Sequence, residues 1–150
     1  MARCSQNHSY DGEIHKFCPV CPRPGRPETI DDWVKICHQN SQAHGFYDDY
    51  YEMIAHLLPV LVSRLKDLYI AERISLIHSE GSECLEDARS GDMEEIKGPN
   101  GKPLGFPSEL ADIVIRCFDL AGFLEIDLEA AIARKHAYNK TRPKKHGKKF

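Results

Sequence analysis

The stretch LIHSEGSECLED, residues 76–87, has the pattern of a helix and places three carboxylates on one strip of it. At about 100° per residue, Glu80, Glu83 and Asp87 fall within roughly 60° of one another. The apolar residues of this segment form the adjoining face, so the three acids border the predicted core. Like charges three and four residues apart repel slightly on a solvated helix, and a strip of this kind can also be ordinary surface.

A second acidic strip follows in the helical pattern SELADIVIRCFDLAGF, residues 108–123. Glu109, Asp112 and Asp119 share one edge of that helix, and most of its other positions are apolar. This strip therefore also flanks a face that the sequence predicts to be buried.

Antiparallel packing of these two helices would bring Glu80 and Glu83 opposite Glu109 and Asp112. At a separation of about 5 Å and an effective dielectric near 20, each pair of carboxylates would repel by roughly 3 kcal/mol. Such a cluster must be protonated or hold cations. Because oxygen ligands favour hard divalent ions, the sequence predicts a site for Mg²⁺ or Mn²⁺.

The bulk composition is that of a globular protein. The chain has 150 residues, with 41% hydrophobic and 29% charged side chains, enough for one domain and a small appendage. The polar start of the sequence lacks the apolar region of a secretory leader. The most apolar run, MIAHLLPVLV at residues 53–62, is too short to cross a membrane. We therefore predict a cytoplasmic protein without a membrane partner.

Changes in composition and the positions of glycine and proline predict three parts: a small module at 1–27, an all-α domain at 28–143 and a basic tail at 144–150. Thr29 and Asp127 are the predicted N-caps of the first and last helices, and Pro59 is expected to break or kink the second helical stretch. Asn100 and Gly101 indicate a hairpin. The predicted helices cover residues 29–44, 49–90, 107–123 and 127–140.

The N-terminal module has the spacing C-x3-H-x9-C-x2-C of a zinc-ribbon knuckle. Cys4, His8, Cys18 and Cys21 are the predicted ligands of one structural Zn²⁺, with His15 as the rival to His8. A disulfide is the weaker interpretation because no secretory leader is evident.

The ordered set of motifs resembles the MazG-like all-α nucleoside triphosphate pyrophosphohydrolases. EGSE at residues 80–83 and ELAD at residues 109–112 match the ExxE…ExxD signature of that family. The resemblance covers most of the chain and extends through NSQAHGFYD (40–48), ISLIHSE (74–80), DLAGFLEIDLEAAI (119–132) and KHAYNKTRPKKHG (135–147).

The resemblance implies an all-α bundle of about four to five helices that binds Mg²⁺ or Mn²⁺. It implies hydrolysis of a nucleoside or deoxynucleoside triphosphate to the monophosphate and pyrophosphate. Glu80, Glu83, Glu109 and Asp112 become the catalytic metal ligands, and Asp119 is an additional candidate.

Two further groups of residues are candidates for binding the substrate. The family pattern Lys…Asn…Arg-Pro, which implies phosphate contacts, is matched by Lys135, Asn139 and Arg142. Binding of the base and the sugar is assigned to the first helix and the residues just after it, through Asn40, His44, Phe46 and Tyr47. An ordinary basic terminus and ordinary packed aromatics are the alternative interpretations.

Three functional classes compete at this point. The first is the pyrophosphohydrolase, expected to be a homodimer or a higher homo-oligomer. The second is a zinc-ribbon module that binds nucleic acid or a protein on a helical scaffold. The third is a non-catalytic nucleotide sensor. The net charge of −3 argues against nucleic acid as the main ligand, and the intact set of four acids argues against a silent sensor.

Overall fold

The computed structural model describes residues 2–3, 9–10 and 29–143 of the chain. The predicted zinc ligands Cys4, His8, Cys18 and Cys21 and the basic tail 144–150 lie outside the described residues. Near the N-terminus, β1 (Ala2–Arg3) pairs antiparallel with β2 (Ser9–Tyr10).

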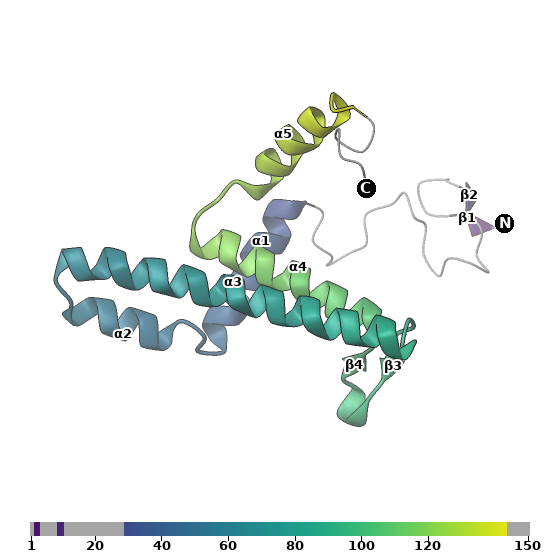
Figure 1. The fold of residues 1–150 in the computed structure, drawn as a ribbon, viewed down its shortest axis with the longest axis horizontal. Coiled ribbons are helices and arrows are strands. Elements are labelled where there is room, and N and C mark those ends of the chain that lie inside the picture. Colours follow the sequence, from purple (N-terminus) through teal and green to yellow (C-terminus); the bar gives the residue numbers. More distant parts are fainter. Residues whose placement is uncertain (1, 4–8, 11–28, 144–150) are drawn as a thin grey trace.

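Helices make up most of the described residues, as the all-α prediction requires (Figure 1). A small hairpin, β3 (Ile96–Lys97) and β4 (Pro103–Leu104), surrounds the 3₁₀ turn η1 (Pro99–Gly101) and confirms the predicted hairpin. The helices are α1 (Ile30–Ala43), α2 (Asp48–His56), α3 (Pro59–Ser90), α4 (Phe106–Phe123) and α5 (Leu128–Lys140).

Local signals in the sequence set the ends of these helices. Thr29 is the N-cap of α1, as predicted: Asp32 N donates to Thr29 Oγ1 at 3.0 Å and Thr29 N donates to Asp32 Oδ2 at 3.1 Å, which forms a capping box. Asp127 caps α5 by accepting from Ala130 N at 2.9 Å. The chain leaves α1 through Gly45, whose φ of +77° suits glycine.

The break at Pro59 produces a helical hairpin. Leu57 and Leu58 adopt extended backbone angles, and Pro59 then occupies the first position of α3, where its missing N–H is tolerated. Helix α2 consequently runs back along the N-terminal half of α3 (Figure 1). Of the two predicted outcomes at Pro59, a break or a kink, the structure shows the break, and the chain reverses its direction there.

Helix α4 packs along the C-terminal half of α3, α1 packs against α4, and α5 contacts α1 (Figure 1). Ile30, Trp33 and Cys117 lie on the apolar faces of their helices but are only partly buried. Among the described residues, no helix is long and apolar enough to cross a membrane. The buried apolar side chains among the described residues are Val34, Cys37, Tyr47, Tyr50, Cys84 and Ala121.

The hairpin fixes the start of α4. Phe106 N donates to Asp92 O at 2.9 Å. Gly105 has a φ of +97°, and a Cβ atom there would lie 2.3 Å from Glu94 O. Only glycine allows this approach, which places Glu109 in the first turn of α4 beside the end of α3.

Close packing of α1 on α4 depends on Gly122. A Cβ atom at this position would lie 2.5 Å from His38 Cβ. We expect Gly122→Ala to lower the free energy of unfolding by about 1 to 3 kcal/mol, because the two helices must separate. Urea denaturation measures this loss. The matched control is Gly81→Ala in α3, where no atom lies within 4 Å and alanine should stabilise the helix by about 0.5 to 1 kcal/mol. Equal effects of the two substitutions would contradict the close approach.

Candidate metal centre

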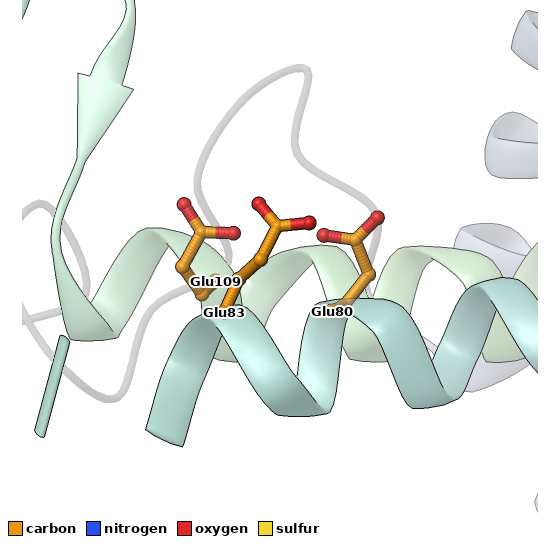
Figure 2. Close-up of side chains that lie close together, drawn as sticks. All are labelled: Glu80, Glu83 and Glu109. Atoms are coloured by element: carbon orange, nitrogen blue, oxygen red, sulfur yellow. The ribbon is translucent and has the colours of Figure 1, made fainter. Parts of the chain in front are cut away.

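Three glutamates gather where α3 and α4 pack together. Glu80 and Glu83 come from α3 and Glu109 comes from α4. One carboxylate oxygen of each lies within 4.8 Å of the other two. Figure 2 shows the three carboxylates side by side on the same side of the two helices. We call these residues the carboxylate cluster.

Glu109 is a largely buried residue whose carboxylate has no partner of opposite charge among the described residues. The residue is 9% exposed, and the described residues offer its carboxylate no hydrogen bond or ion pair. Burial, followed by the negative charges of Glu83 and Asp112, raises the pKa of Glu109 above its ordinary value of 4.5. A buried carboxylate in this position is stabilised by a proton or by a cation.

Glu80 does have a partner. Arg116 Nε donates to Glu80 Oε1 at 2.5 Å, and Arg116 Nη2 contacts the same oxygen. The residue Glu80 is 6% exposed, and the side chain of Arg116 is 37% exposed. Sequence reasoning missed Arg116, although it lies two turns after Glu109 on the same edge of α4.

Two more acids border the carboxylate cluster. Asp112, the predicted fourth ligand, is not in the group of three, although its charge contributes to the raised pKa of Glu109. Asp87 has a buried Oδ2 with no hydrogen-bond partner among the described residues. A surface cavity of about 320 Å³ adjoins these acids; it is lined by Ser79, Ser82, Glu83, Glu86, Asp87 and Glu109.

The structure does not bring Asp119 to the carboxylate cluster. The Asp119 carboxylate points toward α1, where its Oδ1 accepts from Tyr47 Oη at 2.8 Å and from His38 Nδ1 at 2.9 Å. Asp119 is 7% exposed. The pKa of Tyr47 is raised, first by the burial of Tyr47 and then by its hydrogen bond to Asp119. The arrangement is a buried polar network, which sequence periodicity alone did not separate from the acidic strip.

Of the residues predicted to bind the base and sugar, only some reach the surface. Asn40 and His44 are exposed, and His44 Nδ1 donates to Asn40 O at 2.8 Å. Phe46 is 58% exposed. Tyr47 is 1% exposed and its ring stacks on Phe123 at a centroid distance of 5.1 Å. The structure thus corrects the assignment of Tyr47, whose ring faces are covered by other side chains.

A larger cavity of about 510 Å³ lies between the loop after α1 and helices α2 and α3. Phe46, Tyr69 and Leu76 contribute apolar surface to it. Arg73 stacks over Tyr69, with its Cζ 4.5 Å from the ring centroid, and Arg73 Nη2 donates to Phe46 O at 2.5 Å. Tyr69 and Arg73 were not predicted, because their role depends on the reversal of the chain at Pro59.

The predicted phosphate-binding residues lie on or just after α5. Lys135 Nζ lies 5.7 Å from the ring centroid of Tyr138, and the Arg142 guanidinium also lies over that ring. Asn139 Oδ1 is buried without a hydrogen-bond partner in the described part of the chain. Within residues 29–143, no hydrogen bond or ion pair joins these side chains to the carboxylate cluster.

The donor set of the carboxylate cluster fits a hard divalent cation. It offers carboxylate oxygens from three side chains on two packed helices, with no nitrogen or sulfur ligand in the group. Such donors suit Mg²⁺ and Mn²⁺ better than Zn²⁺. The unpartnered carboxylate of Glu109 supplies the charge that a cation would neutralise.

Comparison of the chain with family models, with curated proteins and with solved structures found no match. The resemblance to MazG-like pyrophosphohydrolases therefore rests on the quoted motifs, and the activity that it implies stays a prediction.

Proposed function

We propose that the protein hydrolyses a nucleoside or deoxynucleoside triphosphate to the monophosphate and pyrophosphate, in a reaction that requires Mg²⁺ or Mn²⁺. The observation that carries the proposal is the carboxylate of Glu109, a largely buried residue, which lies beside Glu80 and Glu83 and has no partner among the described residues. The order of the EGSE and ELAD motifs, which resembles that of the pyrophosphohydrolases, supports the same activity.

Glu80, Glu83 and Glu109 would hold the cation, with Asp112 available beside them. A divalent ion bound there would supply the charge that lowers the pKa of an attacking water and neutralises the polyphosphate. Glu80 and Glu109 are largely buried, and Glu83 is exposed.

The cavity beside Phe46 and Tyr69 is suited to the base and sugar. It is mostly apolar and has an exposed aromatic ring, features that favour stacking of a base. Leu76 lines this cavity and lies one helical turn before Glu80 of the carboxylate cluster. The two sites therefore adjoin along α3, as a triphosphate and its nucleoside require.

A pyrophosphate-release assay tests the proposal. The full-length protein is incubated with a panel of ribo-, deoxyribo- and modified nucleoside triphosphates, with Mg²⁺ and with EDTA in excess. We expect equal amounts of monophosphate and pyrophosphate from at least one nucleotide, in the Mg²⁺ reactions only. Release of orthophosphate would contradict the predicted bond cleavage, because a pyrophosphohydrolase leaves the two terminal phosphates joined.

The same assay separates the competing classes. A nucleotide sensor would bind a triphosphate without releasing pyrophosphate. A helical scaffold for a zinc-ribbon module would neither bind a triphosphate nor release pyrophosphate. Such a protein would bind its nucleic-acid or protein ligand through residues outside the carboxylate cluster. Either result would overturn the enzymatic proposal.

We also propose that the protein self-associates, as expected from its sequence. Several large apolar side chains of the α2–α3 hairpin are exposed, among them Leu58, Val60 and Leu68. Apolar residues of α4 also border an open cavity with Trp33. Surfaces of this kind favour contact with a second copy of the chain.

A further inference from the structure

Arg116 lies next to the carboxylate cluster and contacts one of its three members, Glu80. In the part of the chain that the structure describes, it is the only basic side chain with an ion pair to the three glutamates. Its guanidinium reaches Glu80 from α4, the helix that also carries Glu109. The side chain is 37% exposed, so part of the group remains open to a ligand.

Both nitrogens of Arg116 that contact Glu80 converge on one oxygen, Oε1. The guanidinium has five N–H donors, and this contact uses Nε and Nη2. Nη1 has no hydrogen-bond partner among residues 29–143. Donors therefore remain for an incoming group with acceptor oxygens.

The charge of Arg116 acts in opposite directions on two ligands. A bare divalent cation held by Glu80 and Glu109 would lie near the positive guanidinium, which repels it. A divalent cation that carries a polyphosphate presents negatively charged oxygens instead. Guanidinium groups bind such oxygens through short, charge-assisted hydrogen bonds.

We propose that Arg116 makes the carboxylate cluster selective for a divalent cation complexed with a polyphosphate over the bare cation. This inference rests on the proposed function and assigns to it a residue that selects the form of the ligand. The competing role is purely structural: a guanidinium that only orients Glu80 would support binding of both ligands equally.

Two titrations of the full-length protein test the proposal with Arg116→Met, which keeps an unbranched apolar side chain and removes the guanidinium and its charge. Binding of Mn²⁺ alone is followed through the electron paramagnetic resonance signal of the free ion. Binding of inorganic pyrophosphate at saturating Mg²⁺ is followed by calorimetry. We expect the variant to bind Mn²⁺ as tightly as the wild type or up to about tenfold more tightly. We expect its affinity for pyrophosphate to fall by about tenfold to a hundredfold.

The matched control is Arg89→Met. Arg89 pairs with Glu86 near the end of α3, where both side chains are exposed, at an Nη1 to Oε1 distance of 2.7 Å. Because that pair is solvated and outside the carboxylate cluster, both affinities should be unchanged. Arg116→Lys keeps the positive charge and loses the planar set of guanidinium N–H donors. It should bind Mn²⁺ like the wild type, and its affinity for pyrophosphate should lie between those of the wild type and Arg116→Met.

The outcomes separate this inference from the function on which it rests. If Arg116→Met loses affinity for both ligands by the same factor, or keeps its affinity for pyrophosphate, Arg116 does not select the ligand and the inference is wrong. If the wild-type protein binds neither ligand, the proposed function itself fails and the inference falls with it. Thermal unfolding of each variant shows that the comparison is between folded proteins.

Discussion

Replacing Glu109 by Gln is expected to lower metal-dependent hydrolysis by at least about a hundredfold. Loss of a side chain that only supports a metal ligand typically costs tenfold to a hundredfold in metal affinity or activity, and loss of a ligand should cost no less. The glutamine amide would keep the shape of the side chain and remove its charge. Steady-state release of pyrophosphate at saturating Mg²⁺ measures the effect.

The same substitution should stabilise the metal-free protein. Glu109 is largely buried, and its carboxylate lies among other acids and has no partner in the described residues, whereas an amide carries no charge to desolvate. The melting temperature of the variant in EDTA should therefore exceed that of the wild type. Mg²⁺ should raise the melting temperature of the wild type only, because binding stabilises the folded form.

The raised pKa of Glu109 also determines whether the stability of the folded protein rises or falls with pH. Between its ordinary value of 4.5 and its raised value in the folded protein, the folded form binds more protons than the unfolded form. Stability of the wild type then decreases as pH rises through this window. Glu109→Gln lacks the titrating group, so its advantage should shrink at acidic pH and be fully present above the raised pKa.

Glu52→Gln is the control, because Glu52 is an exposed acid on α2 and lies outside the carboxylate cluster. It should change neither hydrolysis nor the response to Mg²⁺. If Glu109→Gln hydrolyses the substrate at the wild-type rate, the assignment of Glu109 as a metal ligand is wrong.

Signals between neighbouring residues predicted the fold well. Thr29, Asp127 and Pro59 act through the backbone within one helical turn, so their effects do not depend on the rest of the chain. The pairing of α3 with α4 could also be predicted, because the two acidic strips border apolar faces that must be covered.

Neighbours in space could not be predicted in the same way. Asp119 shares a helical edge with Asp112, but α1 packs against α4 and gives Asp119 two partners, His38 and Tyr47. Arg116 is an unremarkable charged residue in the sequence until α3 places Glu80 beside it. These contacts depend on how helices distant in sequence are rotated against one another, which periodicity does not determine.

Replacing Asp119 by Ala is expected to produce the largest loss of stability among these variants, about 3 to 5 kcal/mol. The substitution removes the acceptor shared by Tyr47 Oη and His38 Nδ1. Tyr47 is almost completely buried between α1, α3 and α4, so its hydroxyl would be left without this acceptor away from water. Urea denaturation in EDTA measures the loss without a contribution from bound metal.

Tyr47→Phe removes one donor and leaves Asp119 with His38, so it should cost only about 0.5 to 1.5 kcal/mol. Tyr138→Phe, at an exposed tyrosine of α5, should have no measurable effect on stability.

Asp119→Asn keeps an acceptor oxygen and serves as the folded variant for metal titration. Its affinity for Mn²⁺ should equal that of the wild type, because Asp119 lies outside the carboxylate cluster. Weaker Mn²⁺ binding together with unchanged stability would instead identify Asp119 as a ligand and contradict the network described above.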